Sequence, residues 1–253
     1  MQLEEVRAIV SGAASGLGRH FTLALASAGA LVAAGDIDQA ALDALAVETA
    51  NLKGRVITLK LDVAQETSVV EFVNRATQEF GGVNLLVNNA GILRDGLLAK
   101  DEGGWVRKLP QASWKQVMDV NLTGAYMMTR EVVADVLKRG IKESVIVNIS
   151  SISRAGNPGQ SNYAASKAGL DACTRTWALE LAPHSIRVGG IAPGLIETPI
   201  LRHISEEALK SLTDKIPLQR VGTPQEIWLA LKFIIECDYF TGRVIEVDGG
   251  STF

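Results

Sequence analysis

The chain has few cysteines, no excess of basic residues and no long apolar run, and each shortage excludes a class of protein. Two Cys in 253 residues cannot form a disulfide framework, which indicates a reducing compartment. A formal net charge of −3 lacks the basic footprint of a nucleic-acid-binding protein. No apolar run approaches the roughly 18 residues of a membrane-spanning helix. The acidic N-terminal residues 1–5 lack a signal-peptide pattern. We therefore expect a cytoplasmic protein without a nucleic-acid or membrane partner.

Metal-binding patterns are also lacking. The chain has three His, and no spacing of His, Cys and carboxylates suggests a metal site. We therefore expect no metal centre.

The chain does contain a regular alternation of apolar runs and amphipathic stretches, without a linker or an internal repeat. Short runs rich in Val and Ile predict strands, and longer stretches with helical spacing predict helices. The expected strands are residues 6–10, 31–35, 55–61, 85–87, 145–149, 186–191 and 244–247, and the expected helices include 69–80, about 114–138, 162–181 and 227–235. This pattern predicts one α/β domain over residues 1–253, with a parallel sheet covered by helices on both faces.

A glycine-rich turn follows the first expected strand. Residues 11–18 read Ser-Gly-Ala-Ala-Ser-Gly-Leu-Gly and precede a helical pattern. In this context a nucleotide phosphate can rest on the amides of a helix N-terminus, and glycine lets the backbone approach it closely. A tight turn that merely requires glycine is the plainer alternative. If the turn binds a dinucleotide, the contact residues are Gly12, Ser15, Gly16, Leu17 and Gly18.

Asp36 ends the second expected strand. A carboxylate there can accept hydrogen bonds from the ribose hydroxyls of NAD and would repel the 2′-phosphate of NADP. No Arg or Lys lies in the glycine turn or immediately after Asp36, so we predict NAD as the cofactor. The plainer alternative for Asp36 is a helix N-cap, for which Asp38 is an equally good candidate.

Polar or turn-forming residues also follow the next four strands. Each could be only a loop residue. Because ligands of parallel sheets bind outside the carboxyl ends of the strands, the four groups together are expected to outline one crevice. The groups are Asp62-Val63, Asn88-Asn89-Ala90-Gly91, Ser150-Ser151 and Pro193-Gly194.

Tyr163 and Lys167 lie four residues apart within an expected helix. Residues at this spacing face the same side of a helix, so the phenol and the ammonium can reach one small volume. An unperturbed Tyr has a pKa of about 10 and a nearby cation lowers it, so a tuned Tyr can exchange a proton with an alcohol or a ketone. An ordinary amphipathic helix would also explain the pair taken alone.

Together these motifs resemble the short-chain dehydrogenase/reductase family over essentially the whole chain. The matching motifs are Ser11-Gly12-x-x-x-Gly16-x-Gly18, Asn88-Asn89-Ala90-Gly91, Asn121 in Asp-Val-Asn-Leu, Ser150-Ser151, Tyr163-x-x-x-Lys167 and Pro193-Gly194. The resemblance implies a doubly wound Rossmann domain with a seven-stranded parallel sheet. It also implies, commonly, a homotetramer packed partly through two long central helices.

The resemblance further implies a catalytic tetrad and a cofactor cleft. Tyr163 would be the general acid/base, and Lys167 would lower its pKa and hold the ribose hydroxyls of the nicotinamide half. Ser151 would bind the substrate oxygen, and Asn121, through its backbone or side chain, would hold a water linking Lys167 to solvent. The implied cofactor contacts are Asp62 and Val63 at the adenine, Asn89, Ala90 and Gly91 along the cleft, Pro193 and Gly194 after the sixth strand, and Ile196 and Thr198 at the carboxamide.

Which serine acts is left open by the spacing. Family members with this strand end usually use the second Ser, thirteen residues before the Tyr, whereas here Ser151 lies twelve residues before Tyr163 and Ser150 lies thirteen. Adjacent strand residues point to opposite faces, so the two cannot serve equally. We favour Ser151, because a shorter loop disturbs less than a shifted strand register.

Three other features bear on function. Gly189 stands where the family commonly has Asn, which removes one local hydrogen bond. Residues 99–113 are about eight longer than is usual in the family; Trp105 there either covers the substrate or anchors an exposed loop. Residues 195–217 are expected to form a substrate lid with an apolar set of side chains at Ile196, Ile200, Leu201, Ile204, Leu209 and Leu212, and with Arg202 and His203 as candidate contacts for an anionic substrate.

The substrate itself is not defined by these patterns. The apolar lid suits a hydrophobic secondary alcohol or ketone, although packing of the lid on the body explains it equally well. The segments 191–199 and 241–250 resemble 3-oxoacyl reductases and 3-hydroxyacyl-CoA or hydroxysteroid dehydrogenases, so a 3-oxoacyl thioester is one alternative substrate. A non-catalytic NAD-binding scaffold or sensor is the alternative from another class.

Overall fold

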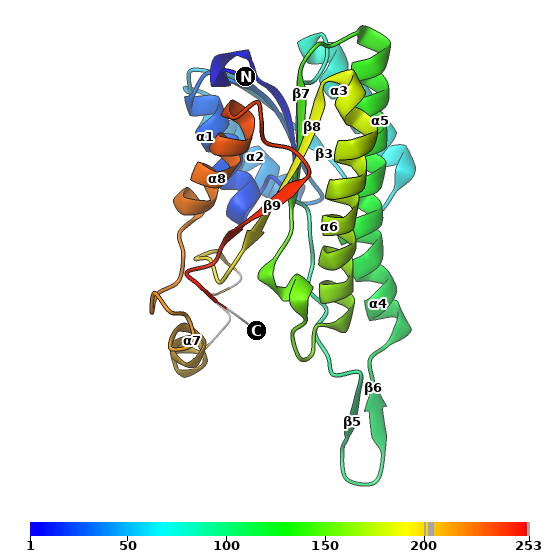
Figure 1. Cartoon of the computed structure of the whole chain (residues 1–253), viewed down its shortest axis with the longest axis vertical. Coiled ribbons are helices and arrows are strands. Elements are labelled where there is room, and N and C mark those ends of the chain that lie inside the picture. Colours follow the sequence, from blue (N-terminus) through cyan, green and yellow to red (C-terminus); the bar gives the residue numbers. More distant parts are fainter. Residues whose placement is uncertain (200, 202–204, 252–253) are drawn as a thin grey trace.

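A twisted parallel sheet runs through the centre of the molecule in this computed structural model, which describes residues 1–199, 201 and 205–251 (Figure 1). Within those residues the sheet has seven strands in the order β3-β2-β1-β4-β7-β8-β9, every neighbouring pair parallel. The strands are β1 (Arg7–Ser11), β2 (Leu31–Asp36), β3 (Arg55–Lys60), β4 (Leu85–Asn88), β7 (Ser144–Ile149), β8 (Ile186–Pro193) and β9 (Arg243–Val247). This confirms the predicted doubly wound α/β fold.

Helices cover both faces of the sheet. In Figure 1, α1 and α8 lie on one face, and α3, α5 and α6 lie on the other. The helices are α1 (Gly16–Ser27), α2 (Gln39–Thr49), α3 (Glu66–Phe80), α4 (Gln111–Met118), α5 (Gly124–Arg139), α6 (Ser161–Leu181), α7 (Glu206–Thr213) and α8 (Pro224–Glu236).

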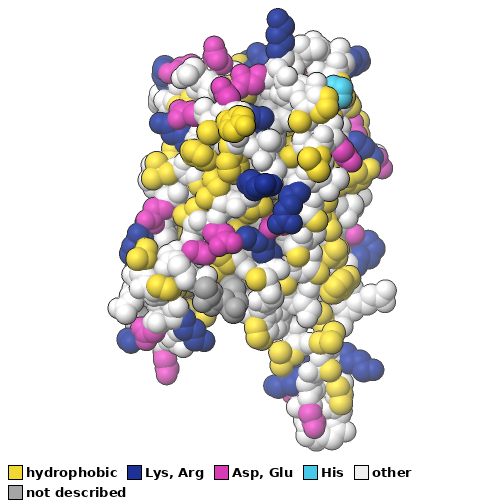
Figure 2. Space-filling view, in the orientation of Figure 1, with side chains coloured by type: hydrophobic (Ala, Val, Ile, Leu, Met, Phe, Trp, Pro, Cys, Tyr) yellow, Lys and Arg dark blue, Asp and Glu magenta, His cyan; other side chains and the backbone are white. Residues whose placement is uncertain are grey.

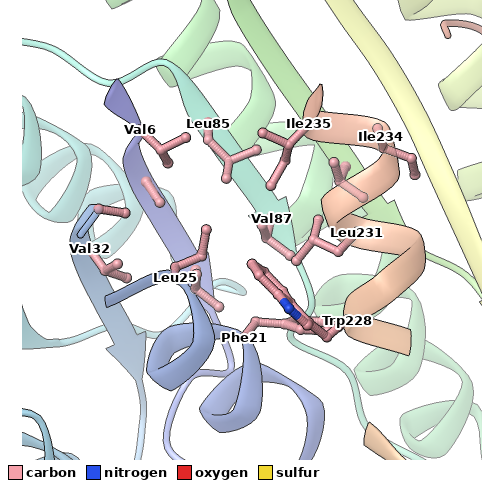
Figure 3. Packing of buried hydrophobic residues seen from close by; sticks show 14 of the residues in the cluster. Val6, Phe21, Leu25, Val32, Leu85, Val87, Trp228, Leu231, Ile234 and Ile235 are labelled. Carbon is pink, nitrogen blue, oxygen red and sulfur yellow. The ribbon is translucent and has the colours of Figure 1, made fainter. Parts of the chain in front are cut away.

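Alternation along each strand divides the core between the two faces. Val10 of β1 belongs to the cluster that also contains Phe21 and Leu25 of α1 and Leu231 of α8. Figure 3 shows part of this cluster, with Phe21, Leu25 and Leu231 labelled. Ile9, the neighbour of Val10, points to the opposite face, toward α3, α5 and α6. Strands buried on both faces read as continuous apolar runs, which is why the central strands were identifiable in the sequence.

The expected long helix over residues 114–138 is interrupted. It begins earlier, as α4, and continues into α5 through a π-helical turn, Asp119–Thr123. Such single π turns are frequent at functional sites. Asn121 lies in this turn and is buried.

Residues 99–108 form an antiparallel hairpin rather than a plain loop. Its strands are β5 (Ala99–Asp101) and β6 (Val106–Lys108), and the hairpin projects beyond the end of α4 (Figure 1). Figure 2 shows hydrophobic side chains beside basic ones on this projection. Trp105 is 58% exposed, so the expectation that it anchors the segment is wrong.

The segment after β8 turns back over the carboxyl ends of the strands. Ile196 forms a parallel bridge with Gly222, and α7 follows within the expected lid. Of the predicted lid residues, Ile200, Arg202, His203 and Ile204 lie outside the described residues.

Candidate active site

The glycine turn is shaped by close backbone approaches. Gly12 has φ +64°, and a Cβ there would lie 2.8 Å from Ala90 Cα. A Cβ on Gly18 would lie 2.1 Å from the Gly12 carbonyl oxygen, so both positions require glycine. Gly16, with φ +52°, is the first residue of α1, and Ser15 is its N-cap. The turn therefore leads directly into a helix N-terminus, the arrangement that accommodates a phosphate.

Asn89 fixes this turn from the neighbouring strand end. Its side-chain amide donates to the carbonyl oxygens of Ser11 and Gly12, both at 3.0 Å. The Ser11 hydroxyl accepts from the backbone amides of Asn89 and Ala90, both at 3.1 Å. The Asn89 side chain thus holds the turn, which leaves its backbone and that of Ala90 for a ligand.

Asp36 is oriented by two backbone amides. Its Oδ2 accepts from Ala14 in the glycine turn at 3.0 Å, and its Oδ1 accepts from Asp38 at 3.1 Å. The N-cap of α2 is Asp38, whose Oδ1 accepts from the amide of Ala41 at 3.0 Å. The capping alternative for Asp36 is therefore wrong, and its carboxylate faces the glycine turn.

Asp62 and Val63 lie at the end of the third strand beside α5. The Asp62 carboxylate accepts from the amide of Ala64 at 3.0 Å. Val63 is buried, and a Cβ on Gly124 would lie 2.9 Å from the Val63 Cβ. Val63 therefore packs on the start of α5, with Asp62 next to it at the rim.

The chain after β8 lies on the other side of the glycine turn from Asp62 and Val63. A Cβ on Gly194 would lie 2.6 Å from Asp248 Cα, so the chain after Pro193 passes very close to the last strand. Further along, the Thr198 side chain lies 3.8 Å from the position of a Cβ on Gly16. The segment carrying Ile196 and Thr198 thus covers the glycine turn.

Tyr163 and Ser151 lie next to each other beyond the carboxyl end of β7. The phenol of Tyr163, on α6, makes a hydrogen bond with the Ser151 hydroxyl from the end of β7. Burial raises the pKa of Tyr163; the Ser151 hydrogen bond opposes this and the charge of Asp95 adds to it. Ser151 also accepts from the Ser153 amide at 3.1 Å, which fixes its rotamer.

Lys167 lies beneath the Tyr163 ring. Its Nζ lies 5.6 Å from the ring centroid and donates to the carbonyl oxygen of Ile149 at 2.6 Å. Lys167 is 4% exposed, and burial lowers its pKa to about 8, with Asp171 acting in the opposite direction. The phenol and the ammonium therefore do share one small volume.

Asn121, in the π-helical turn, lies close to Lys167. Its Oδ1 accepts from the Ile92 amide at 2.8 Å and its Nδ2 donates to the Ile92 carbonyl at 3.0 Å. A Cβ on Gly91 would lie 3.5 Å from Asn121 Oδ1 and 3.7 Å from Lys167 Nζ. The side chain is engaged by Ile92, so the backbone of Asn121 is the part left to hold a water.

Ser150 points away from the phenol. Its hydroxyl lies 3.5 Å from the carbonyl oxygen of Lys167 and is on the side of Asp171. Burial raises the pKa of Asp171, and the Ser150 hydroxyl acts in the opposite direction. Of the two candidate serines, Ser151 is the one in contact with Tyr163.

Position 189 holds Gly where the family commonly has Asn, and the reason is steric. A Cβ there would lie 2.9 Å from both Ile234 and Phe240, so the space that an Asn side chain would need is filled.

Sequence reasoning missed the charged pair behind the site. Arg154 follows Ser151 in a short 3₁₀ turn, and its Nε lies 2.7 Å from Oδ2 of Asp171 on α6. The available signal was the position of Asp171, four residues after Lys167 and so on the same helix face. Among the residues that the structure describes, no three His, Cys, Asp or Glu side chains are placed to hold a metal ion.

Fold and crevice together define an oxidoreductase of the nicotinamide-binding, short-chain type, and the chain belongs to the short-chain dehydrogenase/reductase family. A family model described as "Enoyl-(Acyl carrier protein) reductase" matches residues 12–252. A crystal structure of a short-chain type dehydrogenase/reductase from Mycobacterium marinum has a TM-score of 0.91 and 30% identity, covering 99% of this chain and 97% of that one.

The more specific likeness is to one group of reductases. The 3-oxoacyl-[acyl-carrier-protein] reductase FabG of Thermotoga maritima is 42% identical over 253 residues, 99% of each chain. The 3-oxoacyl-[acyl-carrier-protein] reductase of Synechocystis is 36% identical over 248 residues, 96% of this chain and 95% of the relative. Within the described ranges, no helix is long and apolar enough to cross a membrane.

Proposed function

We propose that this protein transfers hydride between NAD(H) and a secondary alcohol or ketone, with Tyr163 as general acid/base. The observation that carries this proposal is the hydrogen bond between the Tyr163 phenol and the Ser151 hydroxyl, with Lys167 Nζ 5.6 Å from the centre of the same ring. Two neighbouring hydroxyls can both donate to a carbonyl oxygen that gains negative charge in the transition state.

In reduction, Ser151 and Tyr163 both donate hydrogen bonds to the substrate oxygen, and Tyr163 then gives up its proton to the alkoxide. In oxidation the phenolate takes the alcohol proton. Because burial raises the pKa of Tyr163, the phenol is protonated near neutral pH, which is the form that reduction requires. A bound nicotinamide would supply or accept the hydride.

Lys167 and Asn121 support the proton transfer. An ammonium has three N–H donors, and within the described part of the chain Lys167 donates one of them, to Ile149. The other two can serve ribose hydroxyls and a water. The positive charge also stabilises the phenolate left after proton transfer. The backbone of Asn121 is suited to hold that water and connect Lys167 to solvent.

The residues present fit a dinucleotide, since two close-packed glycines form the turn and the first residue of α1 is a third. We assign the cofactor contacts to the turn, to Asp36, to the strand ends and to the segment after β8. They are Gly12, Ser15, Gly16, Leu17, Gly18, Asp36, Asp62, Val63, Asn89, Ala90, Gly91, Tyr163, Lys167, Pro193, Gly194, Ile196 and Thr198.

A Tyr163→Phe variant tests the catalytic assignment. It keeps the ring and removes the transferable proton, so we expect NADH binding within about twofold of the original protein and a loss of turnover of at least about 100-fold. Tyr239→Phe, at a fully exposed position, is the matched control and should retain full turnover. Turnover that survives in Tyr163→Phe would refute the mechanism and favour a non-catalytic NAD-binding scaffold.

Cofactor preference is tested at Asp36. Its carboxylate, held beside the glycine turn by the Ala14 amide, should give NADH a higher kcat/KM than NADPH in one ketone assay. Asp36→Asn removes the charge that repels a 2′-phosphate, so the ratio of the two kcat/KM values should move toward NADPH by about tenfold or more. Asp43→Asn, on the exposed face of α2, should leave the ratio unchanged. A preference for NADPH in the unaltered protein would contradict the role of Asp36.

Among ketones, we propose 3-oxoacyl thioesters as the substrate class to examine first. Two relatives with this activity in their names match this chain over almost its full length, and the segment after β8 contributes buried Ile196 beside the crevice. Comparing kcat/KM for a 3-oxoacyl thioester on carrier protein, the same acyl group on coenzyme A and a simple cyclic ketone would test this. Equal values for all three would leave a general hydrophobic alcohol or ketone as the substrate.

We also propose a cytoplasmic homotetramer. The outer sides of α5 and α6 expose Tyr126, Leu137 and Leu179, the last of them 80% exposed. Burying such apolar side chains between copies would be favourable. Light scattering that gives a mass close to the 27.0 kDa of a single chain would contradict the tetramer.

A further inference from the structure

A buried carboxylate lies directly behind the proposed catalytic pair. Asp171 is 5% exposed and follows Lys167 by one helical turn on the same face of α6. Since fully buried acidic side chains are rare unless they are paired, its presence requires an explanation.

Asp171 is paired with Arg154, which comes from the segment that follows β7 and not from α6. Arg154 lies in the 3₁₀ turn Ile152–Ala155, immediately after Ser151, and its Nε is 2.7 Å from Asp171 Oδ2. Its Nη2 reaches Glu246 Oε1 on β9 at 2.5 Å. This chain of charges joins the loop that carries Ser151 to the helix that carries Tyr163 and Lys167.

The pair is poorly suited to stabilising the fold alone. Arg154 Nη1 is buried and has no hydrogen-bond partner in the described part of the chain. A buried ion pair with an unsatisfied donor often contributes less than apolar residues of similar volume would. Its position one turn from Lys167 suggests an electrostatic role instead.

The charges around Lys167 act in opposite directions. Burial lowers the pKa of Lys167, and the negative charge of Asp171 opposes this. Burial raises the pKa of Asp171, and the Ser150 hydroxyl and the positive charges of Arg154, Arg175 and Lys167 oppose this. Beyond these, Asp95 acts on Tyr163 and Glu246 holds Arg154 from the outside.

We propose that Asp171 and Arg154 are positioning residues that balance the charge of Lys167 and so set the pH range in which Tyr163 transfers its proton. The negative charge of Asp171 favours the protonated form of Lys167. Arg154 weakens this effect because its positive charge partly neutralises the Asp171 carboxylate. The inference rests on the proposed function, because it acts through Tyr163 and Lys167.

Two single variants give opposite predictions. Reduction requires a protonated Tyr163 and a charged Lys167, and both forms are lost as the pH rises. Asp171→Asn removes a negative charge, so both groups lose their protons at lower pH and the alkaline limb of kcat/KM moves down by about one pH unit. Arg154→Gln removes a positive charge, so the same limb moves up.

A purely structural ion pair would behave differently. Either variant would then lower the melting temperature and kcat, and the alkaline limb would stay in place. Glu180→Gln is the matched control, because it removes one carboxylate from an exposed position on the same helix. It should leave the pH profile unchanged.

The measurement is kcat/KM for ketone reduction with NADH from about pH 6 to 10, with a melting curve for each variant. Shifts of opposite sign support the proposal; no shift, or two shifts of the same sign, overturns it. If Asp171→Asn does not fold, Arg154→Gln decides alone, an upward shift supporting the proposal and any other result overturning it. Failure of the proposed function would show separately, as turnover that persists in Tyr163→Phe.

Discussion

Lys167 brings an ionisable group into a place that water barely reaches. Burial lowers the pKa of Lys167 to about 8, compared with 10.5 for an unperturbed lysine. Between these two values the unfolded chain holds a proton that the folded protein has released. Stability therefore rises with pH across this window, by an amount on the order of 3 kcal/mol.

Comparison with a Lys167→Met variant isolates this contribution. We expect the free energy of unfolding of the original protein to increase, relative to that of the variant, by about 3 kcal/mol between pH 8 and 10.5, since Met does not titrate. Denaturant melts at several pH values measure the difference. Lys138→Met on α5 is the control and should show no such trend; a constant gap for Lys167→Met would mean that the ammonium is better solvated than its burial indicates.

At the scale of single residues, the sequence identified the site residues but not their hydrogen-bond and ion-pair partners. Tyr163, Lys167, Ser151 and Asn121 were all singled out, and the fold does bring them to one crevice. The orientation of Asn121 toward Ile92 was beyond prediction because it depends on a loop far away in the sequence. The shortened loop after Ser151 could be recognised in the sequence, but the ion pair between Arg154 and Asp171 could not.

Among the elements, a line of buried amides connects the middle of the sheet to two helices. Asn88 of β4 donates to Thr129 of α5 at 3.0 Å and to Asn148 of β7 at 2.9 Å. Asn148 then donates to Thr174 of α6 at 2.9 Å. These bonds fix the strand ends relative to α6, which carries Tyr163, and to α5, which follows the turn that carries Asn121.

Asn148→Leu tests this connection. The two side chains have similar shapes, but Leu leaves Asn88 with one fewer acceptor and Thr174 without a donor to its hydroxyl, so we expect a loss of about 2–3 kcal/mol in the free energy of unfolding. Urea melts measure it. Asn74→Leu, at an exposed position on α3, should change stability by less than about 0.5 kcal/mol. Equal effects at both sites would show that the buried line does not stabilise the fold.

Element boundaries were predicted well where periodicity was strong. The central strands agree with the prediction to within about two residues. The π-helical turn in the long helix was not predicted, because residues 119–123 carry no Pro or other signal of a break. The hairpin was not predicted either, since its strands of three residues are too short to show an alternating pattern.

For the whole molecule, the hairpin formed by β5 and β6 is separate from both hydrophobic cores. Trp105 and Val106 are each more than half exposed, and both cores lack any residue of the hairpin. Replacing residues 99–108 with a short Gly-Ser turn should therefore change the free energy of unfolding by less than about 1 kcal/mol, or roughly 2–4 °C in Tm.

Calorimetry and an NADH assay with a small ketone measure the outcome of this replacement. Trp105→Ser in an intact hairpin is the control, because it removes the exposed ring and keeps the backbone. A large loss of turnover in both variants would show that Trp105 covers the substrate.

The topology of the whole sheet followed from the alternation of strands and helices, together with the family resemblance. Strand order was not contained in the periodicity itself, because β1 pairs with β4 across a separation of more than seventy residues. The reversal of winding between β1 and β4 places the glycine turn beside Asn89. This is the crevice in which parallel sheets bind their ligands.

The position of the hairpin along the chain also divides the sheet into two complete blocks. All strands before it form the contiguous set β3-β2-β1-β4, and the later strands form β7-β8-β9. A chain opened at Gly103-Gly104 would yield two fragments, each with an unbroken part of the sheet, that meet along the border of β4 and β7. The proposed dinucleotide turn would lie in one fragment and Tyr163 in the other. We therefore expect the proposed activity to be lost in the separate fragments and to return when fused partners bring them together.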